Sequence, residues 1–464
     1  MREQKTIVDG VEFGTIFQFQ RIFGAISSSM HPARLFVAFG MVLVLLASGS
    51  IWDSVSNVDA TTLDGSIAQA DLDQAREFAI AQAATSLDHF APEGSDSWSV
   101  VEAQTYLLEA WEEYVFEGDV TVKERLEFEL VYLELEKVRI RGPFEASATY
   151  VAKHWNEIVD AGIHADAVSM WQGVVAIVWE LPKLLWKGGY HSFISLYGFL
   201  LLYVLCIGGG AIARMQVCWH SRAERLAMGE AIDFSLSRWR QLLTAVCAPL
   251  MFVAAITIFL LLMGLVLLSI PWLNFIGGLL YGAALLLGFL IAIIAVAYAA
   301  CFPMLIPAVV TEGCGGEEAI QRSFAYLFSS VIRYLGYLIV LVISLVLGYL
   351  VIRLLAHLTL DITANLVSAG TLNNSLSGAG VAEHNAIPTV GLAWYESGAG
   401  FLVRLWEIIV RDLMIGWVLS GFFSTSAMLY LLMRKACDGQ NTRTIWSRGI
   451  IQGTNVPEQY DSSD

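Results

Sequence analysis

The stretch FIGGLLYGAALLLGFLIAIIAVAYAACFP, residues 275–303, decides the fold class of this chain. It contains no charged side chain, and a helix that crosses about 30 Å of hydrocarbon needs roughly 20 apolar residues. Backbone polar groups find no partner in lipid, so such runs are expected to be helical. Comparable apolar runs occupy Leu35–Ile51, Leu196–Ala213, Thr244–Ile270, Tyr334–Ala356 and Leu413–Met433. The sequence therefore predicts an all-α integral membrane protein with about six transmembrane helices and a mostly helical extracytoplasmic domain.

The composition agrees with this class of protein. Hydrophobic residues make up 56% of the 464 residues and charged residues only 15%, whereas soluble domains carry about 25% charged residues. The first apolar run, 35–51, is short, and Ala47, Ser48 and Ser50 would suit a signal-peptide cleavage site. The long segment 1–34 before it favours an uncleaved anchor instead.

The distribution of Lys and Arg predicts the orientation in the membrane, because cytoplasmic loops carry an excess of these residues. The loop His357–Val403 contains neither residue type. Basic residues gather instead before the first run, between the second and third, between the fourth and fifth, and after the sixth. We expect a multi-pass protein of the cytoplasmic membrane with both termini in the cytoplasm. In this scheme, residues 1–34 form a cytoplasmic amphipathic segment on the inner leaflet, and residues 434–464 form a disordered tail.

The segment 52–195 is expected to be an acidic extracytoplasmic domain. Between Trp52 and Ser192 there are 25 acidic and 9 basic residues, which accounts for the formal net charge of -16 of the whole chain. Such a charge repels nucleic acid and anionic lipid head groups. We therefore expect the domain to stand clear of the bilayer or to face a cationic protein partner, with no nucleic-acid partner. Homo-oligomerisation stays open.

Hydrophobic periodicity predicts helices across this domain. The segment Thr121–Arg141 alternates like a strand but also fits a helix, and its helix-forming residues favour the helix. The expected helices are Asp71–His89, Ser97–Phe116, Thr121–Arg141 and Ala146–Asp160.

Three tryptophans mark the end of the domain. Trp171, Trp179 and Trp186 recur at helical spacing, and Trp prefers the head-group layer of a membrane. We interpret Met170–Lys187 as a helix on the outer leaflet, with a buried domain helix as the alternative.

A short internal repeat follows two of the apolar runs. The pattern Glu-Ala-Ile-x-x-Ser occurs at 230–235 and again at 318–323, each time before the next run. The predicted unit is span, cytoplasmic helix, span, repeated in the same direction, unlike the inverted repeats of many transporters.

Several motifs resemble those of an uncharacterised family of bacterial multi-span membrane proteins. They are Gly142-Pro143-Phe144 with Tyr150 downstream, the sequence GGGAIAR at 208–214, and EG-x-x-x-x-EAI-x-x-S at 312–323. The cytoplasmic helix is also loosely similar to the membrane regions attached to some glycerophosphodiester phosphodiesterases, although no phosphodiesterase domain accompanies it here. The resemblance implies a membrane topology and a bacterial setting, and it implies no activity.

One polar cluster is a candidate metal site. On a continuous helix, His154, Glu157, Asp160 and His164 lie on one side, and imidazole with carboxylate is a ligand set for zinc or manganese. Gly162 weakens the helix, however, and a solvated polar face is the simpler interpretation.

No other feature indicates catalysis. The sequence lacks the hydrolase, P-loop, zinc-protease and dinucleotide-binding fingerprints, and it has no Cys-x-x-Cys pair. None of the six cysteines falls in the acidic domain, so no disulfide framework is expected there. We expect no cofactor.

Two functional hypotheses remain. The first is a non-enzymatic membrane protein that acts as a binding, assembly or envelope scaffold through its acidic extracytoplasmic domain. The alternative is a permease or channel for a neutral or lipid-like substrate, suggested by the tandem repeat. The span interiors carry no Asp, Glu, Lys, Arg or His near their centres, whereas ion-coupled transporters usually have such a group there. They carry small residues such as Gly278 and Gly282, which allow close helix packing.

Overall fold

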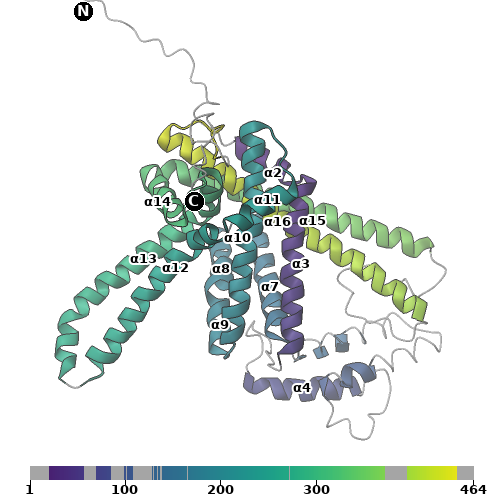
Figure 1. Cartoon of the computed structure of the whole chain (residues 1–464). Coiled ribbons are helices and arrows are strands. Elements are labelled where there is room, and N and C mark those ends of the chain that lie inside the picture. The colour runs from purple at the N-terminus through teal and green to yellow at the C-terminus, as the bar shows by residue number, and fades with distance from the viewer. Residues whose placement is uncertain are drawn as a thin grey trace, which may run out of the picture. The chain divides into compact units, whose positions relative to one another are not determined.

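A computed structural model describes residues 20–56, 69–84, 99–107, 128–270, 272–370 and 394–446, except positions 101, 129, 133, 136–137, 140 and 165. Six of the described helices are long and apolar enough to cross a membrane (Figure 1). The prediction of an all-α, multi-pass membrane protein is therefore confirmed. The six are α3 (Pro32–Val55), α10 (His191–Arg222), α12 (Trp239–Met263, continued by the π-helical turn η3, Gly264–Leu268), α13 (Leu273–Glu312), α15 (Val331–Gly370) and α16 (Trp394–Asp438).

Shorter helices precede or join the spans. They are α2 (Gln20–Ser29), α4 (Gln69–Ala84), α7 (Pro143–Ile163), α8 (Ala167–Val175), the π-helical turn η2 (Ala176–Glu180), α9 (Leu181–Lys187), α11 (Met228–Ser237) and α14 (Gly316–Ser329).

The chain divides into two compact units. The first comprises 1–42, 201–349 and 415–464, and the second comprises 43–200 and 350–414. Four spans, α3, α10, α15 and α16, contribute residues to both units. The unit limits therefore lie within these spans, whereas the predicted domain limits were placed at the ends of spans.

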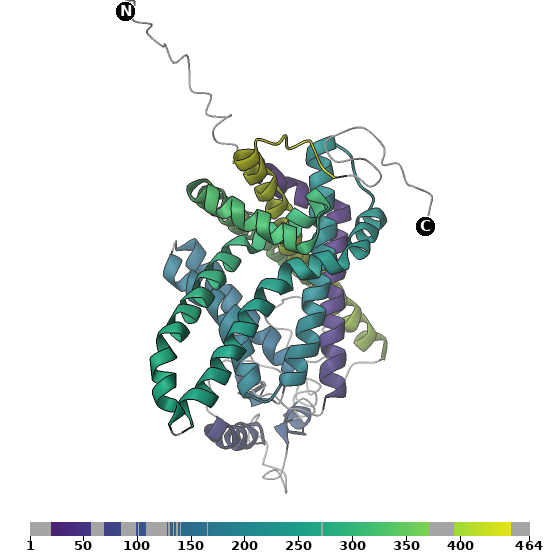
Figure 2. The same ribbon diagram turned by 60° about the vertical axis from the view of Figure 1, so that its left-hand side comes forward.

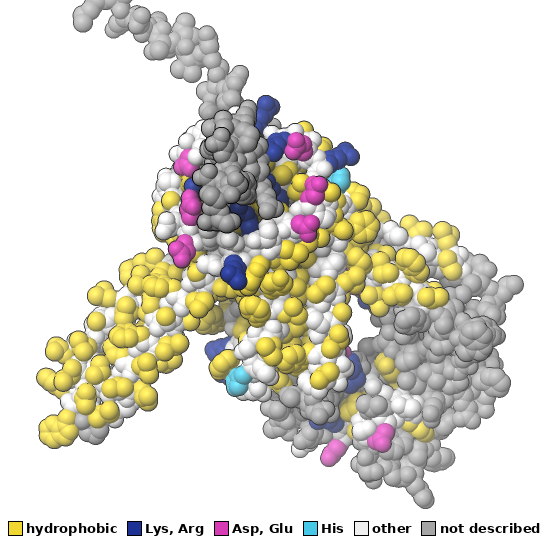
Figure 3. Space-filling model, viewed as in Figure 1, with side chains coloured by type: hydrophobic (Ala, Val, Ile, Leu, Met, Phe, Trp, Pro, Cys, Tyr) yellow, Lys and Arg dark blue, Asp and Glu magenta, His cyan; other side chains and the backbone are white. Residues whose placement is uncertain are grey.

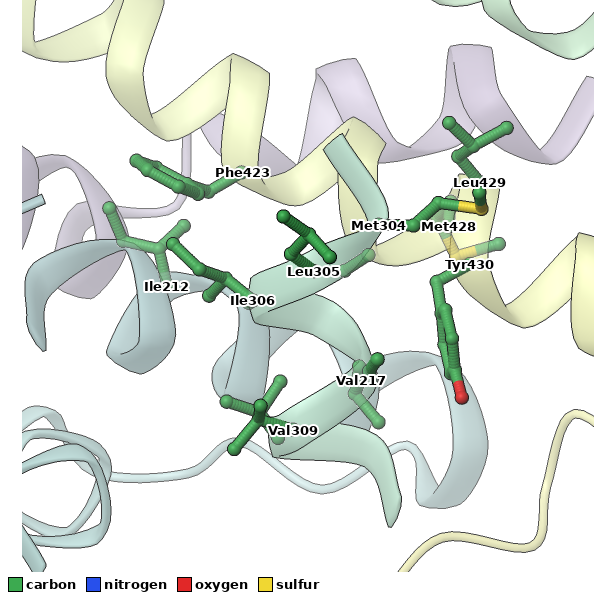
Figure 4. Packing of buried hydrophobic residues seen from close by; sticks show 14 of the residues in the cluster. Ile212, Val217, Met304, Leu305, Ile306, Val309, Phe423, Met428, Leu429 and Tyr430 are labelled. Atoms are coloured by element: carbon green, nitrogen blue, oxygen red, sulfur yellow. The ribbon is translucent and has the colours of Figure 1, made fainter. Parts of the chain in front are cut away.

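Helices α10, α13 and α16 form the core of the first unit (Figure 4). Ile212, Leu305 and Leu429 are each 0% exposed. The GGG sequence predicted as the end of the second span explains how α10 fits there. A Cβ at Gly209 would lie 2.4 Å from the ring of Phe423 on α16, so only glycine permits this approach.

The first unit also contains a long apolar hairpin, α12–η3–α13 (Figure 2). Side chains on several sides of it are exposed, for instance Leu279 (77%) and Tyr281 (51%). Hydrophobic side chains cover the visible face of the hairpin (Figure 3). A surface of this kind suits hydrocarbon, because lipid tails are as apolar as leucine.

The tandem span, short helix, span order is present twice, as α10–α11–α12 and α13–α14–α15. Each short helix begins two residues before the repeated glutamate and is joined to the next span through one residue, Arg238 or Ser330. The structure adds a third copy of part of the pattern, Ala-Ile-x-x-Ser at 25–29, in α2 before α3. The alanine and the serine are 0% exposed in all three copies.

The second unit contains two small cores. Phe128, Leu135 and Leu107 are 0% exposed and pack with residues of α4, and the described residues between 128 and 138 are helical apart from the gaps. The helical interpretation of 121–141 is thus confirmed for the described residues from 128 to 138, whereas Arg139 and Arg141 are not helical. The other core joins α7, η2, α9 and the first turn of α10.

One prediction is described only in part, and another needs correction. Of the predicted membrane-facing segment 1–34, the structure describes residues from 20 on; Phe23 of α2 is 44% exposed, whereas Ile22 and Ala25 of the same helix are buried in the core of the first unit. Residues 434–464 are not disordered from their start: α16 continues to Asp438, and the chain stays ordered to Trp446 through hydrogen bonds to the bundle. Residues beyond 446 lie outside the described part.

Candidate functional site

The most buried charged group of the first unit lies where α13, α14 and α16 meet. We call Glu312, Arg322, Tyr430 and Arg434 the Glu312 cluster. The Glu312 side chain is 1% exposed, and its carboxylate lies 2.8 Å from Arg434 Nε and 3.0 Å from Arg322 Nη1. Tyr430 Oη donates a hydrogen bond to the same carboxylate over 3.2 Å. One carboxylate thus faces two guanidinium groups, an arrangement that is destabilised strongly if one partner is lost.

Three groups cap the end of α13. The last carbonyls of a helix have no partner within it, and cations near them are favoured by the helix dipole. Arg214 Nη1 donates to the carbonyl of Val310 over 2.7 Å, and Arg238 donates to that of Gly313. The backbone N–H of Trp446 donates to the carbonyl of Thr311 over 2.9 Å. Neither Pro303 nor Pro307 ends the helix, although proline costs about 3 kcal/mol in a helix interior, and α13 is buried continuously from Pro303 to Glu312.

The chain after α16 is held by the same arginines. Arg214 Nη2 donates to the carbonyl of Trp446 over 2.8 Å, and Arg434 Nη1 donates to that of Thr444 over 2.6 Å. The guanidinium of Arg238 lies 4.3 Å from the ring of Trp446, a cation–π contact. These arginines were interpreted from sequence as topology signals only. Their burial gives them a second, structural role that no spacing in the sequence reveals.

One motif of the family resemblance, Gly142-Pro143-Phe144, lies in the second unit. It contacts the end of α3. The Asp53 carboxylate accepts hydrogen bonds from the backbone N–H groups of Phe144 (2.9 Å) and Glu145 (2.8 Å), and so caps the N-terminus of α7. A Cβ at Gly142 would lie 2.2 Å from Asp53 Cγ. A glycine is therefore required at this close approach. We call Gly49, Asp53, Gly142 and Phe144 the α7 joint.

Aromatic rings extend the joint to α10. The rings of Phe144 and Tyr197 are 5.4 Å apart, and those of Trp52 and Phe193 are 5.8 Å apart. Tyr197 Oη donates to the carbonyl of Leu45 over 3.1 Å. The ends of two spans, α3 and α10, thus hold α7 from two sides.

The three tryptophans lie on the exposed side of α8, η2 and α9. Trp171, Trp179 and Trp186 are 65%, 70% and 58% exposed, and we call them the tryptophan face. The opposite side packs on α7, where a Cβ at Gly173 would lie 2.5 Å from Ile158. The alternative of a fully buried helix does not describe these side chains.

The predicted metal ligands come together only in part. His154 Nδ1 lies 2.6 Å from Glu157 Oε2, whereas His164 Nδ1 lies 2.8 Å from the carbonyl of Asp160. Among the described residues no group of three His, Cys, Asp or Glu side chains could hold a metal ion. The metal site therefore stays a prediction for which the structure supplies one pair.

The thiol outside the spans is not set up as a nucleophile. Burial raises the pKa of Cys314 to about 11, so the thiolate is scarce at neutral pH. Burial and the neighbouring Asp438 also raise the pKa of Tyr326, whose hydroxyl stays protonated and donates to that carboxylate. Both groups act in packing and hydrogen bonding here.

Comparisons of the chain with protein-family models, with curated proteins and with solved structures found no match in any of the three.

Proposed function

We propose that this protein is a non-enzymatic, multi-pass scaffold of a bacterial cytoplasmic membrane, which binds a partner protein or an envelope component through the region between α3 and α10. Both termini face the cytoplasm, and α7–α9 face the extracytoplasmic side. The observation that carries the proposal is the α7 joint. A capped helix held by the ends of two spans suits a surface that must be presented in a fixed orientation.

The chemistry of the region indicates the kind of partner. The acidic charge of 52–192 favours a cationic surface, and the tryptophan face offers large, rigid aromatic contacts of the kind enriched in binding hot spots. The partner should therefore combine basic residues with an apolar patch.

The first test is native mass spectrometry of the full-length protein, extracted from its own cells in mild detergent. The scaffold function predicts one stoichiometric partner, which is lost when Trp171, Trp179 and Trp186 are all replaced by alanine. A matched control replaces three exposed aromatics of the apolar hairpin, Trp272, Phe275 and Phe289, which are 93%, 81% and 66% exposed. No partner in any preparation, or equal loss in both variants, would refute the proposal.

The permease or channel hypothesis keeps one supporting observation, the tandem order α10–α11–α12 and α13–α14–α15. Purified protein in liposomes distinguishes it. Solute movement above that of empty vesicles, together with absence of a stoichiometric partner, would favour transport.

The proposed orientation has its own test. Cysteines introduced at Ala152 in α7 and at Ala227 before α11 are both exposed. A membrane-impermeant maleimide applied to spheroplasts should label Ala152→Cys before lysis and Ala227→Cys only afterwards. The reverse order would invert the topology.

A further inference from the structure

A cavity of about 380 Å³ lies at the junction of α2, α3 and the end of α10, within the first unit. Its volume falls near the lower end of the range of small-molecule sites. Three of its lining side chains carry a positive charge or gain one on protonation, namely those of His31, Arg34 and Arg225. The polar part of the wall also includes Trp219, Glu224 and the hydroxyls of Ser27 and Ser28.

The positive charge of this cavity is poorly compensated. Arg34 is 5% exposed, and its guanidinium donates to neutral acceptors, namely the carbonyl of Ser28 (2.7 Å) and the side-chain oxygen of Gln216. The guanidinium of Arg225 lies 5.5 Å from the ring of Trp219. Among the described residues no ion pair joins either arginine to a carboxylate. Glu224 also lines the cavity, but its ion pair is with Arg222, at 4.0 Å, and its side chain is 67% exposed.

The same excess of positive charge acts on the side chain of His31. Burial, then the positive charges of Arg34 and Arg225, lower the pKa of this imidazole. A buried arginine facing only neutral partners, with a second arginine and a histidine beside it, is an arrangement that an anion would stabilise.

The position of the cavity selects the kind of anion. It lies where α2 ends and the span α3 begins, and these two helices carry exposed apolar side chains. Phe23 on α2 is 44% exposed, Met30 is 46% exposed, and Phe36 on α3 is 62% exposed. Basic pockets beside transmembrane helices bind the head groups of anionic lipids. A soluble phosphate would use the arginines but not these apolar side chains.

We propose that this cavity binds the phosphate-bearing head group of an anionic phospholipid, with Arg34 and Arg225 on the phosphate and the exposed apolar side chains along the acyl chains. The site belongs to the first unit and does not depend on the proposed scaffold function, which rests on the second unit.

The test uses the full-length protein in mild detergent, with lipid retention measured by native mass spectrometry. Phosphatidylglycerol should be retained at least about fivefold more than phosphatidylcholine, and Arg225→Gln should reduce that retention about fivefold, as expected for one basic residue near an anionic head group. The matched control is Arg240→Gln. Arg240 is also exposed and also stacks on a tryptophan, 5.4 Å from the ring of Trp239, but it does not line the cavity. It should leave retention unchanged.

One further variant and one competitor complete the design. The double variant His31→Gln/Arg225→Gln should retain less lipid than Arg225→Gln alone, at an unchanged apparent melting temperature. Equal loss with Arg225→Gln and Arg240→Gln would show general surface attraction and overturn the proposal. Displacement of the lipid by millimolar inorganic phosphate, with equal stabilisation by both, would indicate a soluble anion instead and would also overturn it.

Discussion

At the scale of single residues, we expect the largest loss of stability from a substitution of Glu312. We expect Glu312→Gln to destabilise the first unit by about 3–5 kcal/mol, because the buried Arg434 would then lose its carboxylate and Arg322 would keep only its exposed partner Glu318. The measurement is the apparent melting temperature of the purified protein in detergent.

Glu318 supplies the matched control for this prediction. It pairs with the same Arg322 at 2.6 Å, but its side chain is 49% exposed. An exposed pair contributes only about 0–1 kcal/mol, so Glu318→Gln should change the melting temperature little. Equal effects of the two substitutions would show that the buried ion pairs of the Glu312 cluster stabilise the first unit no more than an exposed pair does.

The α7 joint gives a second prediction at this scale. Gly142→Ala should displace the Asp53 carboxylate and remove the cap of α7, at a cost of about 0.5–2 kcal/mol. Hydrogen exchange of the Phe144 and Glu145 amides should accelerate. Asp53→Ala should have the same effect, and the double variant should be no worse than either single one, because both remove one interaction.

Gly229→Ala is the control for Gly142→Ala. Gly229 lies in α11, where an added Cβ meets nothing within 4 Å. It should therefore leave the exchange of α7 unaffected. Additive effects of Asp53→Ala and Gly142→Ala would argue against a shared contact.

At the scale of helices, the close approach of α10 to α16 depends on Gly209. Gly209→Ala should destabilise by about 1–3 kcal/mol, because the added methyl group overlaps Phe423, which is only 4% exposed and cannot move freely. Gly198→Ala, in the same helix but with open space around the new Cβ, should be neutral or slightly stabilising. Thermal melting of the two variants measures this difference in stability. Equal melting temperatures would contradict the close packing of α10 against α16 at Gly209.

The same helices show what sequence could and could not predict. The six spans follow from apolar length, and the short helices α11 and α14 from a repeated pattern, since both signals are local. The contact of Asp53 with Gly142 joins positions far apart in the chain, and nothing in either position alone indicates it. The burial of Ile22 could not be told from contact with lipid, because periodicity reports which side is apolar but not what covers it.

The candidate sites could be predicted from sequence only to the same extent. Arg214 and Arg434 are positive charges near span ends, and the orientation of the spans in the membrane is enough to explain such charges. Only the fold shows that they also bond to the end of α13 and to the chain after α16. The metal candidates illustrate the converse, because helical spacing places four side chains on one side but does not require them to converge.

At the scale of the whole molecule, the short ordered segment 439–446 after α16 is bound to the first unit by hydrogen bonds. Its Trp446 accepts from Arg214 and donates to Thr311, and its Thr444 accepts from Arg434. Hydrogen bonds to charged groups contribute about 1.5–3 kcal/mol each. A variant ending at Asp438 should therefore melt well below the full chain, since two buried arginines lose acceptors. A variant ending at Gly449 keeps all these contacts and should melt with the full chain. If both variants melted alike, the contacts of residues 439–446 would add nothing to stability, and the arginines would be held by the bundle alone.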